Sequence, residues 1–389
     1  MMIRLKTSKR EPVFFGLAIL IMAAAIWFGL SHPVNYSNKE RGNISYVSAK
    51  VIQVSHEEIS RNDEGVHRGV QDLKVRPLEG SHKGETLEAH NILNLEHSIF
   101  LRENDRFILC IDESPGGGLL TSVHGYRRST GIYLAGLLFL AVLILTCGKQ
   151  GLRSAFGLMF GFVMLIYLSI PMISLGVQPS AAVFASILPI LAVSLISLTG
   201  FTRKTIVTIL STFVGTLLAA LIFRALGALL HISGYNLEDI ETLVVVAQKH
   251  PIHIRDLLFS GVLISCLGAI MDVAVSVVSG VEEVCKTNHA DRNALFRSGL
   301  QLGRDATGAT VNTLILAFVG TFFVTLFLFH IYDIDYVQLM NMDDISIEIA
   351  QALSGATALA LTAPITAFIA SRLLATREKP PGKARKGKK

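Results

Sequence analysis

The sequence predicts an integral membrane protein: a membrane α-helical bundle of about eight transmembrane helices with a small extracytoplasmic β-rich domain. Of the 389 residues, 51% are hydrophobic and 17% are charged, and the mean hydropathy is +0.51. A soluble chain of this size carries about 25% charged residues. The apolar residues also fall in runs of about 18 to 25, the length that crosses a hydrocarbon core about 30 Å thick. These features exclude an ordinary soluble enzyme.

The apolar runs predict the transmembrane helices one by one. They span residues 13–30, 131–147, 154–175, 180–199, 206–230, 257–281, 311–331 and 347–371. The first run follows a basic cluster as a secretory signal does, but it is long and no small-x-small cleavage site precedes Ser31, which favours an uncleaved signal anchor. The chain then divides into an N-terminus with this anchor (1–30), an extracytoplasmic domain (31–130), a seven-helix membrane domain (131–371) and a polybasic tail (372–389).

The distribution of lysine and arginine predicts the orientation, because basic residues near span ends stay in the cytoplasm. With a cytoplasmic N-terminus, 20 basic residues lie inside: Arg4, Lys6, Lys9, Arg10, Lys149, Arg153, Arg203, Lys204, Lys286, Arg292, Arg297, Arg304 and eight in the tail. The short outer loops hold only Lys249 and Arg255. We therefore expect the bacterial cytoplasmic membrane, with both termini cytoplasmic. The basic tail sits where it contacts anionic lipid, and its lack of interleaved aromatics speaks against nucleic acid as a partner.

The segment 31–130 predicts a small β-barrel, for which the oligonucleotide/oligosaccharide-binding barrel is one candidate. Four short runs of β-type residues, 46–54, 72–78, 85–93 and 106–111, are separated by turn residues. Ser114–Gly118 is expected to be a turn or hinge before the second span. Cys110 is the domain's only cysteine, so no disulfide forms within it, and we expect a buried small hydrophobic side chain there. The histidines show no tight ligand spacing, so no metal site is predicted.

Polar residues within the sixth predicted span are the first candidates for function. Asp272, Ser276, Ser279 and Glu283 are spaced four, three and four residues apart, which places them on one stripe of a helix. Ionisable groups inside a span are costly and mark an ion or substrate pathway or an interhelix pair. Asp272 lies about ten residues from the inner end of its span, and a carboxylate at that depth can bind a cation or take up a proton.

A second polar segment leads into the seventh predicted span and contains Arg304, Asp305, Asn312 and Thr313. Asp305, Gly308 and Asn312 fall on one helix face, so we expect this face to pack on the polar stripe, with Asp272 or Glu283 pairing with Arg304. The alternative is that these groups only hold two helices together, each hydrogen bond contributing about 0.6 to 2 kcal/mol. That alternative suits the serines and threonines better than it suits Asp272, where a serine would serve at lower cost.

The stretches Gly268–Ser276 and Arg297–Ala317 give the chain a family resemblance. Together with shorter segments at 149–152, 200–205, 231–234 and 363–364, and with 80–85 in the outer domain, they resemble the YibE/F-like family of bacterial membrane proteins. The resemblance implies a permease-like membrane protein and supplies no substrate. The family's motif falls on Asp272, Arg304, Asp305 and Asn312.

Two functional hypotheses follow from these features. The first is a permease or secondary transporter that moves an ion or small solute along the sixth and seventh helices. The alternative is a non-transporting scaffold or sensor whose outer β-domain binds a partner or envelope ligand. No Walker sequence, glycine-rich nucleotide loop, HExxH motif or paired nucleophile and base is present, so we expect no cofactor and no enzymatic activity. The partners expected are the lipid bilayer and the transported species, and homo-oligomer formation is left open.

Overall fold

The computed structural model describes residues 10–32, 43–62, 65–95, 97–113, 118–235, 240–249, 252–287 and 291–374. The basic residues before Arg10, the predicted turn at 114–117 and most of the polybasic tail lie outside the described residues. The chain forms two compact units, residues 35–146 and residues 1–34 together with 147–389.

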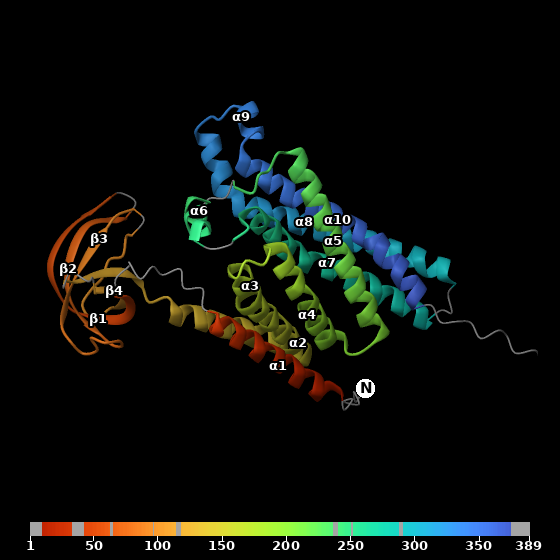
Figure 1. Ribbon diagram of the computed structural model, residues 1–389, viewed down its shortest axis with the longest axis horizontal. Helices are drawn as coiled ribbons and strands as arrows, with labels where there is room; N and C mark the ends of the chain where they lie inside the picture. The colour runs from red at the N-terminus through yellow and green to blue at the C-terminus, as the bar shows by residue number, and fades with distance from the viewer. Residues whose placement is uncertain are drawn as a thin grey trace, which may run out of the picture. The chain divides into compact units, whose positions relative to one another are not determined.

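The first unit contains a closed five-stranded barrel, which confirms the predicted β-barrel (Figure 1). Its strands are β1 (Asn43–Arg61), β2 (His67–Pro77), β3 (Leu87–Leu93), β4 (Arg106–Glu113) and β5 (Leu119–Tyr126), paired in the order β1-β2-β3-β5-β4. All neighbours are antiparallel except β3 and β5. The long β1 closes the barrel, because its first part pairs with β4 and its second part with β2. The sequence runs anticipated four of these strands and missed β5.

Alternating side chains fill the barrel, as the two-residue repeat of a strand requires. Phe107, Leu109 and Ile111 of β4 are buried together with residues of β1 and β2. Cys110 is only half-buried, so the prediction of a buried cysteine is wrong. Since its neighbours Leu109 and Ile111 both point inward, Cys110 must point to the outer face of the barrel.

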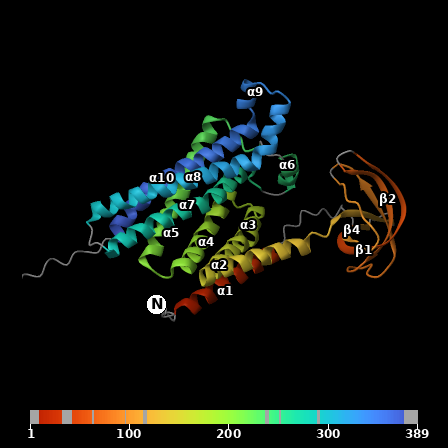
Figure 2. The same ribbon diagram turned by 180° about the vertical axis from the view of Figure 1, so that it is seen from behind.

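The second unit is helical. It contains α1 (Arg10–Ser31), the second part of α2 (Ser129–Met164), η1 (Leu165–Ser169), α3 (Ile170–Ser174), α4 (Pro179–Thr199), α5 (Arg203–Leu229), α6 (Ile240–Lys249), α7 (Ile254–Thr287), α8 (Arg292–Ile331), α9 (Tyr336–Met340) and α10 (Asp343–Leu373). Figures 1 and 2 show α5, α7, α8 and α10 side by side, and α1, α2 and α4 as a second group. The short helices α6 and α9 were not predicted from the sequence.

Seven helical segments of the described chain are long and apolar enough to cross a membrane. One of them, Ser129–Ser174, is 46 residues long, or about 69 Å at 1.5 Å per residue, and it contains two predicted spans. The backbone at Gly148 inside it is not helical (φ 57°, ψ −134°). This break lies at the point where the sequence predicts one span to end, so the prediction of eight crossings depends on Gly148.

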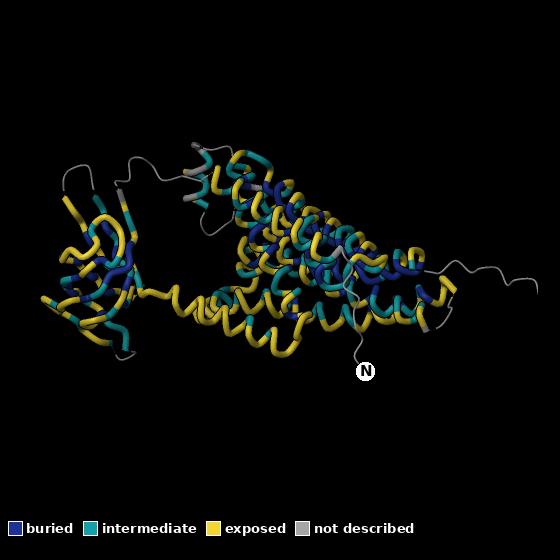
Figure 3. The backbone as a smooth tube through the Cα atoms, turned by 90° about the horizontal axis from the view of Figure 1, so that it is seen from below, coloured by how far each residue is buried: buried dark blue, intermediate teal, exposed yellow. Residues whose placement is uncertain are grey.

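α10 forms the centre of the larger helix group, and small residues bring its neighbours close. A Cβ on Gly303 of α8 would lie 2.8 Å from Ala363 Cβ of α10, and one on Gly299 would lie 3.0 Å from Ala367 Cβ. Glycine at these two positions therefore permits the close approach of α8 and α10. Figure 3 shows buried residues in the interior of each unit and exposed residues on the outer faces of the helices. Outward-facing apolar side chains are expected where a helix meets lipid.

Candidate functional site

The predicted polar stripe lies on the accessible side of α7. Asp272, Ser276 and Glu283 are exposed and Ser279 is half-buried, while the opposite face of the helix, including Val273 and Val277, is fully buried. Ser279 Oγ donates a hydrogen bond to Val275 O at 2.6 Å. Asp272 makes no hydrogen bond or ion pair with the residues that the structure describes. A carboxylate midway along an apolar helix is thus without a partner in the described part of the chain.

On α8 the polar residues predicted to pack on α7 face outward instead. Arg304, Asp305, Asn312 and Thr313 are all exposed, and a Cβ on Gly308 would meet nothing within 4 Å. Thr313 Oγ1 donates to Ala309 O of its own helix at 3.1 Å. Within the described residues, Arg304 forms no ion pair with Asp272 or with Glu283.

The contact between α7 and α8 is made by other residues, so the prediction that their polar faces pack together is wrong. Gly280 of α7 accommodates Leu302, and Gly299 and Gly303 of α8 lie against Val281 and Val277 of α7. Glycines four residues apart let two backbones approach. Asp305 and Asn312 lie roughly 120° to 140° around the helix from Gly299 at 100° per residue, and are therefore turned away from this contact.

Charge pairing at the end of α7 involves Glu282, which the sequence reasoning passed over. Its carboxylate lies 3.5 Å from Lys204 Nζ of α5 and 3.0 Å from Lys286 Nζ. The two lysines come from predicted cytoplasmic segments. Glu282 therefore joins α5 to α7 where both helices are predicted to reach the inner surface.

A second carboxylate was also missed. Glu348 of α10 lines a cavity of about 300 Å³ between α7, α8 and α10, and its Oε2 atom is buried without a hydrogen-bond partner. The other lining residues are Ser265, Leu314, Ala317, Phe318, Thr321 and Gln351. Its position as the second residue of the predicted span 347–371 was the available signal, because a carboxylate so placed is costly unless it has a role.

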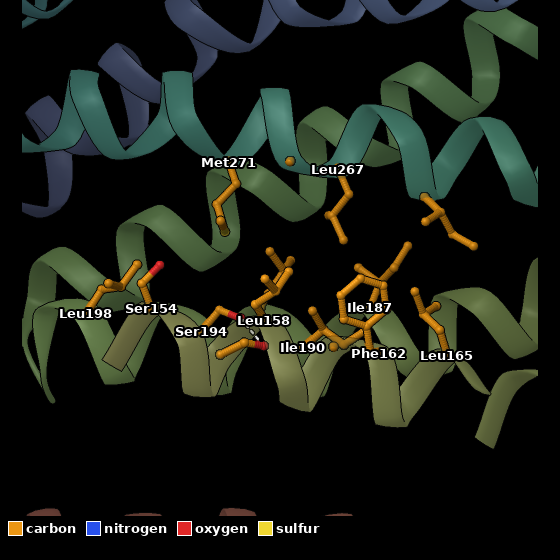
Figure 4. Close-up of a pocket in the computed structure, with 15 residues that line it drawn as sticks. Ser154, Leu158, Phe162, Leu165, Ile187, Ile190, Ser194, Leu198, Leu267 and Met271 are labelled. Atoms are coloured by element: carbon orange, nitrogen blue, oxygen red, sulfur yellow. Dashed lines mark hydrogen bonds between the residues drawn. The ribbon is translucent and has the colours of Figure 1, made fainter. Parts of the chain in front are cut away.

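A further cavity of about 290 Å³ lies between α2, α4 and α7 and is mainly apolar. Figure 4 shows Leu267 and Met271 of α7 pointing toward Ile187 and Leu158 across this space. Gly268 and Met271 line it directly, and Asp272 follows Met271 in the chain. The polar stripe thus begins beside an apolar cavity inside the helical unit.

The barrel has a polar cavity of its own, of about 420 Å³. It is lined by Leu95, His97, Ser98, Ile99, Ile108, His124, Gly125, Tyr126 and Arg128. Nearby, the His67 ring stacks on Phe100 with centroids 4.7 Å apart, and the Tyr126 hydroxyl donates to Phe100 O at 3.0 Å. Aromatic faces beside imidazole and guanidinium groups can hold a polar or anionic ligand.

His82 forms the clearest ionisable cluster on the barrel. Its Nδ1 lies 2.8 Å from Glu85 Oε2 and its Nε2 lies 3.0 Å from Glu113 Oε1. The hydrogen bonds to Glu85 and then to Glu113 raise the pKa of His82 above its ordinary value. The cluster ties the turn after β2 to the end of β4.

Comparison with known proteins identifies the helical unit. The family described as YibE/F-like protein matches residues 135–376, from within α2 to just past α10. The barrel, including the segment 80–85 that resembles the family, lies outside the match. No curated protein and no solved structure matches the chain. Since the family match covers more than half of the chain, this protein belongs to the YibE/F-like family.

Proposed function

We propose that this YibE/F-like protein is a permease or secondary transporter that moves an ion or small solute along the polar stripe of α7. The observation that carries the proposal is Asp272, a carboxylate deep in a candidate span with no partner among the described residues. An acidic residue at the centre of a span costs about 2.5 to 3.5 kcal/mol. That cost is explained if the carboxylate meets a transported cation or a proton.

The geometry of α7 supports a path toward the inner surface. From Asp272 the stripe continues through Ser276 and Ser279 to Glu283, about 16 Å along the helix at 1.5 Å per residue. Each step is one helical turn, so a small cation or proton would pass between neighbouring oxygen atoms. The apolar cavity beside Gly268 and Met271 would take the less polar part of a larger solute.

The orientation with both termini in the cytoplasm is part of this proposal, and three polar contacts support the pairing of span ends that it requires, whichever side faces the cytoplasm. Arg153 Nη2 lies 3.1 Å from Glu11 Oε2, and Lys204 pairs with Glu282, so each contact joins two segments predicted to lie inside. Ser180 Oγ donates to Asp256 Oδ2 at 2.8 Å, which joins two segments predicted to lie outside. A reversed α4 or α7 would separate these pairs by the thickness of the membrane.

Flux through proteoliposomes tests the proposal. Purified full-length protein is reconstituted, and proton, sodium and potassium fluxes are followed with ion-sensitive dyes, for the wild type and for Asp272→Asn. We expect the substitution to lower the flux by about tenfold or more, a loss of at least 1.4 kcal/mol of interaction.

Asp333→Asn is the matched control. It removes a carboxylate from the segment between α8 and α9, where the backbone φ is 50°, a conformation that asparagine tolerates. Equal flux in the wild type and Asp272→Asn would refute the role of Asp272. Loss of flux in both variants would point to a general effect of removing charge.

The cavity of the barrel favours a second function, in which the outer domain binds an envelope ligand and the helical unit anchors or relays it. Arg128, His97 and His124 give the cavity three groups that can bear positive charge, and Tyr126 supplies an aromatic face. The full-length Tyr126→Ala variant separates the two functions. A permease that does not depend on the barrel keeps its ion flux in this variant. A sensor loses the binding of its envelope ligand to the barrel.

A further inference from the structure

The cavity between α7, α8 and α10 brings several side-chain oxygens to one place in the helical unit. Four of its lining residues carry oxygen in their side chains, namely Ser265, Thr321, Glu348 and Gln351, and none of the lining residues is basic. Beside the cavity, Gly355 of α10 allows close approach: a Cβ there would lie 2.7 Å from Cys266 Sγ and 3.0 Å from Cδ2 of the lining residue Leu314.

Glu348 is the lining residue with an unsatisfied side-chain oxygen. Its Oε2 atom is buried and receives no hydrogen bond from the residues that the structure describes. A buried polar atom without a partner costs about 1 to 3 kcal/mol, and more if it is charged. Such an atom therefore needs an explanation, and one explanation is an ion that completes its coordination.

The hydroxyl groups of the cavity are arranged as acceptors. Ser265 Oγ donates its proton to Val262 O at 3.0 Å, and Thr321 Oγ1 donates its proton to Phe318 O at 2.8 Å. A hydroxyl has one proton and two lone pairs. Because each proton is donated to a backbone carbonyl, the lone pairs of both oxygens are available to accept. The Glu348 carboxylate and the Gln351 amide oxygen are the other two side-chain oxygen acceptors among the lining residues.

We propose that this cavity binds a monovalent metal cation, coordinated by Glu348 with help from Ser265, Thr321 and Gln351. Hard cations prefer carboxylate, hydroxyl and carbonyl oxygens. One carboxylate balances one positive charge, whereas a protein cage for Ca²⁺ usually supplies several carboxylates. Asp344, one turn before Glu348 on α10, adds negative charge next to the cavity without lining it.

The site rests on the proposed function and deepens it, because it adds a second cation-binding position to the pathway, on the outer side of Asp272. Ser265 and Asp272 are seven residues apart on α7, which places them on one face and about 10 Å apart along the helix. A cation released by Glu348 would reach Asp272 along this face. The transported species would then be the cation itself or a solute coupled to it.

Direct binding tests the site independently of transport. Full-length protein in detergent is titrated with NaCl, KCl and choline chloride at constant ionic strength, and binding is measured by calorimetry and by the shift in Tm. We expect Na⁺ or K⁺ to bind and choline not to bind. Glu348→Gln keeps the size of the side chain and removes its charge, so the Kd should rise about tenfold or more. Asp333→Asn should bind as the wild type does.

Two results would overturn the site: no difference between metal cations and choline in the wild type, or an unchanged Kd in Glu348→Gln. Thr321→Val and Ser265→Ala each remove one neutral ligand and should raise the Kd by roughly three- to tenfold. If Glu348→Gln does not fold, these two variants decide, and an unchanged Kd in both overturns the proposal.

Asp272→Asn separates the site from the transport function. Binding that survives in this variant while flux is lost supports both proposals. Cation binding by a wild-type protein that moves no ion would support the site and overturn transport. Loss of binding in Glu348→Gln without any change in flux would support the site and overturn its place on the pathway.

Discussion

A buried polar network in the barrel and a buried carboxylate oxygen in the helical unit differ in their hydrogen bonding. In the barrel, Gln71 and Asn91 are 0% and 2% exposed and their side chains are hydrogen-bonded to each other and to the backbone. Gln71 binds Glu57 and both backbone groups of Leu101, and Asn91 binds Gln71 and Ile99 O. In the helical unit, buried side-chain oxygens without a partner include Glu348 Oε2 and hydroxyls of α4, α5, α8 and α10.

The difference in hydrogen bonding indicates a structural role for the barrel network and a binding role for the carboxylate of the helical unit. A hydrogen-bonded buried network fixes a loop in one position, here the segment 97–101, whose Ile99 and Leu101 are buried in the barrel core. Unsatisfied oxygens inside an apolar bundle do not stabilise it, and they are retained at a cost unless something binds them. Ser48 Oγ is the exception within the barrel, and a lone hydroxyl costs far less than a carboxylate.

The largest stability effect is expected where the network is fully satisfied. Gln71→Leu removes the partner of both backbone groups of Leu101 and one of the two partners of the Asn91 amide, which should destabilise the barrel by about 2 to 4 kcal/mol. Hydrogen exchange of the β2 and β3 amides in the full-length protein measures this loss.

Gln53→Leu on the exposed side of β1 is the matched control and should change stability by at most about 0.5 kcal/mol. Glu348→Gln in the helical unit provides the comparison and should leave thermal stability in choline chloride unchanged or higher. If Gln71→Leu and Gln53→Leu exchange alike, the network does not support the barrel and the contrast between the two units disappears.

A smaller effect is expected on α8, where one helix has a packed face and an open face. Gly303→Val forces a side chain against Ala363 and Val277, an overpacking that costs about 1 to 3 kcal/mol. Gly308→Val places the same side chain in open space. Thermal unfolding in detergent should show a lower Tm for Gly303→Val alone. An equal decrease in both variants would mean that the polar face of α8 is also a packed surface in the protein.

Much of the fold was accessible from the sequence because membrane spans and strands leave periodic or compositional patterns. The helix of Asp272 and the four strand runs followed directly from such patterns. The strand β5 was missed because the glycine-rich segment before it suggested a hinge. The break at Gly148 was implied only by the two separate apolar runs on either side of it.

The candidate site was accessible only in part. Asp272 was found from its depth in a span, which is a property of one helix. Glu348 is a candidate because α7, α8 and α10 together line a cavity beside it, and a cavity is a property of several helices. The pairing predicted for Arg304 failed for the same reason: helical spacing fixes which residues share a face, but glycines such as Gly299 and Gly303 decide which face meets a neighbour.

The smallest effect concerns His82 of the barrel, whose two ring nitrogens bind the carboxylates of Glu85 and Glu113. His82 is exposed enough to titrate, and its pKa is raised above 6.5 by Glu85 first and by Glu113 second. A raised pKa in the folded state means that the protonated form stabilises the fold. This contribution is fully present below the ordinary pKa and is lost as the pH rises through the raised value.

The turn that carries His82 should therefore open more readily as the pH rises above this range, a trend absent from His82→Gln. Hydrogen exchange at Gly84, whose N–H donates to Pro77 O at 2.9 Å, reports the opening once it is corrected for the intrinsic effect of pH. Glu85→Gln should reduce the trend more than Glu113→Gln does, because the hydrogen bond to Glu85 is the larger cause of the shift. The reverse order would mean that the link to β4, and not the local turn, holds the proton on His82.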